Sequence, residues 1–497
     1  MAVRQLVDRK PIHQCYNSTS SGQSNQSGEG GINIISTTQT RGNLKLYDSA
    51  WGNGANMPTT PGGNPSGTYS LVPLIAPLRP LSQYGNYIYE WPDNITFETN
   101  DTGFANQMTD IAGWKTVVTN VAETAHPMNY IKKGGSLTPS PSGGYGRAYA
   151  SLLLEVAKIK ELAAAQGWNS IIVPCHLFTH GEGDSARTQY KGELIQYWTD
   201  LNTDIKAITG QREDIPIILS QQCSAPATTT GRSESTIALQ ELAAEYPEKF
   251  YVMPRYQYFC NDQDGALHYR YHIDSVAARR LGEQKAHVYD RGSRGLKTTL
   301  KPLSATLTGN VVRIEFEVPF GSLQFSETQP AVHPIETAWS NGKGFEVEDN
   351  GGRITINSVR ILGNAVEITC NTTPGTGKRV SYAMYQDAVN YNCSIDVGRH
   401  GLLCDSDPFV GYSAKTIACN VTNGSADITC VTTGEFNDRG QFELVSGSGL
   451  IGGSHVTLKP NGDNITLGQV WTGSTGTANL YFKNDHRNYC IQFTLTL

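Results

Sequence analysis

A serine set between small and polar residues lies near the start of the chain, in the motif G-Q-S-N (22–25), and a Gly-rich run (27–31) follows it. A serine on such a turn exposes its hydroxyl and leaves the neighbouring backbone N–H free to bind an oxyanion. Short runs of Ser, Gly, Asn and Gln are also common in ordinary turns. Ser24 is therefore a candidate nucleophile only together with partners elsewhere in the chain.

Two later stretches offer acid–base groups. The motif H-G-E-G-D (180–184) follows the apolar run 170–178, and ligands of open α/β sheets bind where strands end in this way. Asp264, His268 and His272 lie within nine residues just before a helical pattern, where a His and a carboxylate can form a base and its orienting acid. Each stretch also fits a polar turn or a structural His. Their order along the chain favours reading them together with the serine.

This combination resembles the SGNH hydrolases, and more closely the branch that contains sialate O-acetylesterases and acetylxylan esterases. Ser24 stands where the family motif G-Q-S-N has its nucleophile. Residues 178–184 take the place of the family's W-x-Q-G-E-S-D, so the resemblance gives His180 the position of a Gln that helps to bind the oxyanion. The best match to the family's oxyanion glycine is Gly103, in T-G-F-A (102–105). The resemblance covers roughly residues 10–290.

The family's last motif, D-x-x-H-L-(T/S)-x-x-G-x-x-x-L-G-E, leaves the base open. Counting back from L-G-E (281–283) places the family His on His272 and puts Tyr269 where the family has its Asp. Two assignments remain: His268 with Asp264 nearby, or His272 with an acid from elsewhere. We favour His272 because the whole downstream pattern matches. Asp264 and Glu182 are the candidate acids.

The chemistry that the resemblance implies is acyl transfer by a serine-dependent carbohydrate O-acetylesterase. Ser24 would attack the ester carbonyl while the imidazole takes its proton and later protonates the sugar alkoxide. The resemblance implies that the N–H groups of Ser24 and Gly103 and the side chain of His180 donate hydrogen bonds to the oxyanion. The sequence contains no H-E-x-x-H motif, P-loop or dinucleotide-binding glycine fingerprint, so we expect neither a metal nor a cofactor.

The elements that must position these residues alternate between two periodicities, which predicts βαβ units and a parallel sheet. The expected strands are 115–123, 170–178, 215–222 and 249–255, and the expected helices are 147–167, 193–210, 236–247 and 275–289. The resemblance specifies an SGNH-type, flavodoxin-like three-layer domain over 1–292. The Gly/Pro/Asn-rich stretch 28–100 is poorly periodic and reads as long loops of the kind that carry function.

Helical periodicity disappears after about residue 297, where apolar and polar residues alternate between turn residues. This pattern predicts an antiparallel β-sandwich over 293–412. A similar pattern, richer in Gly, Ser, Thr and Asn, predicts a second β domain over 413–497 that binds carbohydrate or mediates oligomerisation. The expected class is therefore an α/β domain followed by one or two β-sandwich domains.

The charge and composition of the chain argue against some classes of binding partner. The net charge is −6, whereas a surface that binds nucleic acid is basic. No apolar run reaches the roughly 18 residues of a membrane span, and the N-terminus lacks the apolar core of a signal peptide. The ten cysteines include no C-x-x-C pair. We favour buried free thiols over disulfides.

A hydrolase followed by β modules, without a signal peptide, resembles the esterase-bearing tail fibres or tailspikes of bacteriophages. That resemblance implies a virion protein, a homotrimer with other tail proteins as partners, and an O-acetylated polysaccharide of capsule or lipopolysaccharide as substrate. The alternative is a non-catalytic glycan-binding adhesin on a degenerate SGNH scaffold. A lipase-like enzyme is less favoured, because the segments around Ser24 are polar.

Overall fold

The computed structural model describes residues 14–31, 34–48, 69–78, 95, 97–135, 147–222, 232–258, 260, 272–327, 329, 331–333, 336–385, 398–432, 441–446, 454–457, 464–466, 470–484 and 486–497. Its N-terminal part forms one sheet with the strand order β3-β2-β4-β1-β6-β7-β8, and β5 pairs with β1 beside β6. Every pairing is parallel except that of β2 with β3. The strands are β1 (Gln14–Gly22), β2 (Leu44–Asp48), β3 (Tyr69–Pro73), β4 (Thr116–Asn120), β5 (Ser170–Ile172), β6 (His176–Thr179), β7 (Ile217–Ser220) and β8 (Phe250–Met253).

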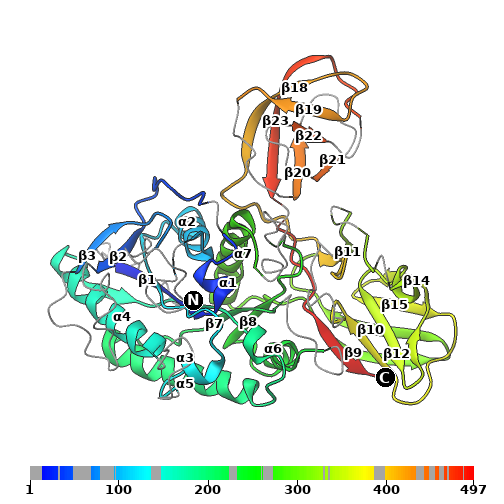
Figure 1. Ribbon diagram of the computed structural model, residues 1–497, viewed down its shortest axis with the longest axis horizontal. Helices are drawn as coiled ribbons and strands as arrows, with labels where there is room; N and C mark the ends of the chain where they lie inside the picture. The colour runs from blue at the N-terminus through cyan, green and yellow to red at the C-terminus, as the bar shows by residue number, and fades with distance from the viewer. Residues whose placement is uncertain are drawn as a thin grey trace, which may run out of the picture.

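Helices cover both faces of this sheet (Figure 1). Along β7, Ile217 and Leu219 pack with α4, α5 and α6, whereas Ile218 packs with α2 and α7 on the opposite face. The predicted α/β domain is therefore confirmed, with helices on both sides of a mostly parallel sheet. The helices are α1 (Ser24–Ser27), α2 (Asn100–Ala112), α3 (Met128–Ile131), α4 (Arg147–Ala165), α5 (Tyr190–Thr209), α6 (Glu234–Glu245) and α7 (Ser275–Ser293).

Several elements differ from the expected ones. Strand β1 was not among the expected strands, and β2 and β3 lie in the stretch 28–100, which was expected to form long loops. The apolar run 170–178 was expected to be one strand, but it forms β5 and β6 with an interruption around Pro174, which has no N–H to donate to a neighbouring strand. Helix α2 was not expected at all. Its polar residues hide its periodicity, but Thr99 caps it by accepting from the N–H of Asp101, and α7 packs closely along it.

The middle of the chain forms two antiparallel four-stranded sheets. Val312 and Ile368 of one sheet pack in the same core as Phe345, Val380 and Phe493 of the other, as the predicted sandwich requires. The first sheet contains β14 (Ile356–Leu362), β15 (Ala365–Cys370), β10 (Val311–Glu317) and β9 (Lys301–Thr308). The second contains β13 (Gly352–Ile354), β12 (Phe345–Asp349), β16 (Arg379–Tyr382) and β24 (Phe493–Thr496), and β11 (Leu323–Phe325) pairs separately with β17 (Leu403–Asp405).

A six-stranded antiparallel sheet follows, and Figure 1 shows it standing apart from the sandwich. Its strands in spatial order are β21 (Ser454–Thr457), β20 (Gln441–Ser446), β23 (Gly476–Asn484), β18 (Lys415–Val421), β19 (Asp427–Cys430) and β22 (Asn464–Thr466). The sequence predicted one C-terminal domain through residue 497, but β24 pairs with β16, so the last residues lie in the sandwich. The final segment is also anchored to the α/β domain, where the Gln221 side chain donates to the carbonyl of Gln492 at 2.9 Å.

The cysteines in the described ranges match the expectation of free thiols. Eight of them are buried and unbridged, among them Cys419 and Cys430, which lie opposite each other on β18 and β19. Cys223 and Cys393 lie outside the described residues. No helix in the described part of the chain combines the length and the apolar character that crossing a bilayer requires.

Candidate active site

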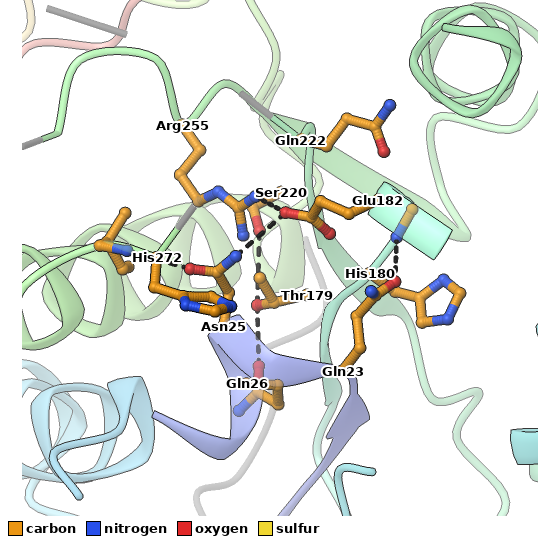
Figure 2. Close-up of polar contacts among 12 residues, drawn as sticks. Gln23, Asn25, Gln26, Thr179, His180, Glu182, Ser220, Gln222, Arg255 and His272 are labelled. Carbon is orange, nitrogen blue, oxygen red and sulfur yellow. Dashed lines mark hydrogen bonds and ion pairs between the residues drawn. The ribbon is translucent and has the colours of Figure 1, made fainter. Parts of the chain in front are cut away.

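The candidate residues gather at the carboxyl ends of the central strands, the edge where open α/β sheets bind ligands. Residues 23–25 follow β1, and residues 180–182 follow β6. Gln222 lies just beyond β7, and Arg255 lies just beyond β8. Figure 2 shows the side chains of Asn25, Glu182, Arg255 and His272 gathered in one small region. Sequence segments more than 200 residues apart thus lie close together at this edge of the sheet.

The turn that presents Ser24 depends on Gly22. Its φ of 142° is one that glycine adopts readily, and a Cβ there would lie 2.2 Å from the carbonyl oxygen of Thr179 at the end of β6. The chain then turns, and Ser24 becomes the first residue of the short helix α1. Ser24 is 7% exposed. Among the described residues, neither its hydroxyl nor its backbone N–H has a hydrogen-bond partner.

Gln23 ties the first motif to the second. Its side-chain carbonyl accepts from the N–H of Gly181 at 3.0 Å and from the N–H of Gly183 at 3.3 Å. Gly181 directly precedes the short 3-10 helix η2 (Glu182–Asp184), and Gly183 lies within it. The side chain next to Ser24 therefore fixes the conformation of the turn that carries Glu182. From the sequence, Gln23 had no expected role beyond its place in the motif.

Glu182, one of the expected acids, is held by two other groups. Asn25 donates to its Oε1 at 3.0 Å, and the guanidinium of Arg255 contacts the same oxygen (Figure 2). Arg255 is fully buried, so this pair neutralises a charge that would otherwise be costly inside the protein. The structure thus makes Glu182 the partner of Arg255. Arg255 was not expected from the sequence, although its place at the end of an apolar strand is a usable signal.

His272 lies against the segment that carries Ser24. The backbone N–H of Ile273 donates to Asn25 Oδ1 at 3.1 Å. His272 Nε2 lies 3.3 Å from Glu29 Oε2, while Nδ1 is buried and has no hydrogen-bond partner in the described part of the chain. The structure therefore places His272 beside the Ser24 segment. The carboxylate next to it, Glu29, was not among the candidate acids Asp264 and Glu182.

Burial lowers the pKa of His272. Glu29 and Glu182 oppose this shift because negative charge favours the imidazolium, and Arg255 adds to it. A His whose pKa is lowered is neutral at neutral pH and can accept a proton. The environment of His272 therefore suits a general base.

His180 is engaged away from Ser24, and this corrects its expected place in the oxyanion hole. Its Nε2 lies 3.0 Å from the carbonyl oxygen of His126, and its Nδ1 lies 2.9 Å from the hydroxyl of Tyr190. Since a carbonyl only accepts, Nε2 must carry the hydrogen, and Nδ1 then accepts from the tyrosine. Both ring nitrogens are thus engaged, and His180 has no further N–H for an oxyanion. Tyr190 also stacks on the ring, with 12° between the planes.

Gly103 also has a structural role that the sequence did not predict. It lies inside α2, where a Cβ would come 2.2 Å from the carbonyl oxygen of Arg279 in α7. Gly282 of α7 meets α2 in the same way, with 2.0 Å to the carbonyl oxygen of Asn100. As the fourth residue of the helix, Gly103 uses its N–H for the helical hydrogen bond to Thr99. The pair of glycines lets two helices pack closely, and the expected oxyanion role of Gly103 is not supported.

Asp264 and His268 lie outside the described residues. Their assignment as acid and alternative base remains a prediction from the sequence. Within the described ranges, no group of three His, Cys, Asp or Glu side chains is arranged to hold a metal ion.

A buried polar network lies beneath α1. The ammonium of Lys285 donates to Thr179 Oγ1 at 2.7 Å, and Thr179 donates in turn to Gln26 Oε1 at 2.8 Å. The amide of Gln26 donates to Asp101 at 3.2 Å. Burial lowers the pKa of Lys285 and raises that of Asp101, and the two charges partly compensate each other. The network connects α1, β6, α2 and α7 directly behind the candidate nucleophile.

No family model matches the chain, and no curated protein matches its sequence. Among solved structures, the chain is similar to a carbohydrate acetylesterase from Xanthomonas citri, with a TM-score of 0.48 and 13% identity over 79% of this chain and 81% of that chain. It is also similar to NanS, with a TM-score of 0.38 and 13% identity over 58% of this chain and 100% of that chain. A protein from Arabidopsis thaliana gives a TM-score of 0.37 and 15% identity, over 56% and 98% of the two chains. Likenesses of this size support no conclusion about activity.

Proposed function

We propose that the chain is a serine-dependent carbohydrate O-acetylesterase of the SGNH type, with Ser24 as nucleophile and His272 as general base. The observation that supports this proposal is the contact between the two segments that carry them. Asn25, next to Ser24, accepts a hydrogen bond from Ile273, next to His272, at 3.1 Å. The hydroxyl of Ser24 makes no hydrogen bond among the described residues, and the pKa of His272 is lowered by burial.

The reaction follows from these groups. Ser24 Oγ attacks the acetyl carbonyl carbon, and its proton passes to the imidazole of His272. The tetrahedral intermediate collapses when the bond to the sugar oxygen breaks and His272 returns the proton to that oxygen. Water then attacks the acetyl-enzyme with His272 again as base, which releases acetate and restores Ser24. The free N–H of Ser24 is the proposed oxyanion donor, and such a donor lowers the barrier by about 3 kcal/mol.

The substrate and setting are proposed from the sequence resemblance. We assign the acetyl group to a bacterial surface polysaccharide, either capsule or lipopolysaccharide, and place the protein in a phage tail as a trimer with other tail proteins. The β-sandwich and the six-stranded sheet would then provide glycan-binding or assembly surfaces beside the esterase.

Acetate release tests the activity. We compare the wild type with Ser24→Ala, His272→Ala and His268→Ala. The substrates are nitrophenyl acetate, a nitrophenyl ester, and O-acetylated bacterial polysaccharide. We expect Ser24→Ala and His272→Ala to lose at least about 10³-fold in kcat. We expect His268→Ala to keep most of the activity.

Ser293→Ala is the matched serine control, because Ser293 lies exposed at the end of α7 and its hydroxyl bonds only locally to the carbonyl of Asp290. Loss of activity in His268→Ala but not in His272→Ala would assign the base to His268. Unchanged turnover in Ser24→Ala would refute the proposal. A wild type that hydrolyses neither substrate but binds the polysaccharide would instead support the adhesin.

A further inference from the structure

The carboxylate beside His272 belongs to neither residue that the sequence suggested as the acid. Glu29 Oε2 lies 3.3 Å from His272 Nε2. Both side chains are largely buried, Glu29 at 7% and His272 at 16% side-chain exposure. A carboxylate that close to a shielded imidazole interacts with it strongly, because little water screens the pair. The contact leaves Nδ1, the other ring nitrogen, available to take a proton.

We propose that Glu29 is the positioning residue of this site: it orients the ring of His272 and stabilises the imidazolium that forms when His272 takes the proton of Ser24. The inference rests on the proposed function, because it names the third member of the same catalytic group. A triad acid of this kind stays ionised and accepts a hydrogen bond from the ring nitrogen that does not face the nucleophile.

The Gly-rich run that follows Ser24 explains how Glu29 reaches His272. A Cβ at Gly30 would lie 2.2 Å from the carbonyl oxygen of Ile273 and 2.6 Å from the Cβ of His272, so only glycine permits this approach. Gly28 and Gly31 pack in the same way on the carbonyl oxygen of Glu98, at 2.3 and 2.5 Å. The N–H of Glu29 donates to the carbonyl of Ser24 at 3.0 Å, which fixes the position of Glu29 relative to the nucleophile.

The neighbouring carboxylates are committed to other groups. Glu182 is held by Arg255 and Asn25 (Figure 2). Asp184 accepts the N–H of Met128 at 2.7 Å. Glu98 accepts four hydrogen bonds from the backbone N–H groups of Ile35 and Ser36 and from the hydroxyls of Ser36 and Thr102. Among the described residues, Glu29 is the carboxylate that lies beside a ring nitrogen of His272, at 3.3 Å.

The electrostatics give this role a measurable signature. The charged groups that act on His272 are Glu29, Glu182 and Arg255, and Glu29 is the larger of the two carboxylate influences that raise the pKa of His272 against burial. Removing the charge of Glu29 must therefore lower the pKa of His272 further. The acidic limb of the kcat/KM profile then moves to lower pH, because the base stays unprotonated there.

The experiment compares the full chain as wild type, Glu29→Gln, Glu29→Asp and Asp264→Asn by kcat/KM against pH on the nitrophenyl ester. We expect Glu29→Gln to lose about 10²-fold or more in kcat and to move its acidic limb to lower pH. Glu29→Asp keeps the charge and should fall between Glu29→Gln and wild type. Glu161→Gln is the matched control, because Glu161 is exposed on α4, pairs with Lys158 and should behave as wild type.

A second readout does not need turnover. The ring of His272 is titrated by NMR in Ser24→Ala alone and in Ser24→Ala combined with Glu29→Gln or with Glu29→Asp. We expect the pKa of His272 to fall with Glu29→Gln and to fall less with Glu29→Asp, which also serves if Glu29→Gln does not fold. A pKa and acidic limb that do not move in either variant would overturn the proposal. A limb that moves only in Asp264→Asn would assign the acid to Asp264.

The experiments distinguish a failure of the proposed esterase function from a failure of the proposed role of Glu29. Full activity in Ser24→Ala refutes the esterase mechanism itself, whatever the Glu29 variants do. Loss of activity in Ser24→Ala together with an unshifted profile in both Glu29 variants refutes only the role of Glu29.

Discussion

Asn25 Oδ1 accepts a hydrogen bond from the backbone N–H of Ile273 at 3.1 Å, across 248 positions of sequence. One bond thus joins the residue after the candidate nucleophile to the residue after the candidate base. The other end of the same amide donates to Glu182 at 3.0 Å. Asn25 therefore connects all three motifs that the sequence singled out.

Replacing Asn25 should loosen the site more than the fold. In Asn25→Ala the N–H of Ile273 loses its acceptor and Glu182 loses a donor, so we expect unfolding in urea to cost about 1–3 kcal/mol less free energy. We expect kcat/KM to fall by about 10–100-fold, because the position of His272 is no longer fixed. Steady-state kinetics and urea titration check both. An unchanged kcat/KM would show that the bond does not position His272.

The buried pair of Arg255 and Glu182 predicts a non-additive double mutant. Arg255→Met leaves a carboxylate without its cation, and we expect a loss of about 3–5 kcal/mol in unfolding free energy. Glu182→Gln in the same chain removes that charge and should restore much of the loss. Urea unfolding of the two single variants and the double variant measures the coupling. Purely additive effects would mean that the ion pair is not formed in solution.

Two glycine substitutions separate packing from chemistry. Gly103→Ala places a Cβ against the main chain of α7, and we expect it to destabilise the protein by about 1–3 kcal/mol. Gly192→Ala in α5 is the matched control, since no atom lies within 4 Å of its added Cβ. It should stabilise the protein by about 0.5–1 kcal/mol through helix propensity. Thermal melts compare the two. An unchanged melting temperature in Gly103→Ala would show that α2 and α7 do not pack this closely in solution.

Lys285 should make stability depend on pH in the alkaline range. Burial lowers its pKa from the ordinary 10.5. Between its folded-state and unfolded-state pKa values the unfolded chain binds more protons, so the unfolding free energy rises with pH there. Lys285→Met removes this contribution, and Asp101 is retained in both proteins. Urea unfolding from neutral pH to about 10 should therefore show a steeper rise for wild type. If the unfolding free energy of the two proteins rose equally with pH, the pKa of Lys285 would not be lowered in the folded protein.

Local periodicity was enough to predict most of the elements. Apolar residues repeat every two or every three to four positions because one face of each element must be buried, and this pattern depends only on near neighbours. The helix that ends before Gly167 and the strand at 116–120 were found in this way. Helix α2 was not predicted because its buried residues include the polar Asn100, Asp101 and Gln107, which hide the apolar periodicity. These polar side chains can be buried because residues far away in the sequence form hydrogen bonds with them.

The sequence by itself determined that polar motifs follow the strands of an α/β sheet. The motifs and the strand periodicity can both be recognised within short stretches of residues. Only the tertiary structure decided which side chains meet. In the folded protein Glu182 pairs with Arg255, His180 hydrogen-bonds to Tyr190, and Glu29 lies beside His272. Such pairings depend on strand order and on backbone approaches of a few tenths of a nanometre between segments far apart in the chain, and no short window of residues contains that information.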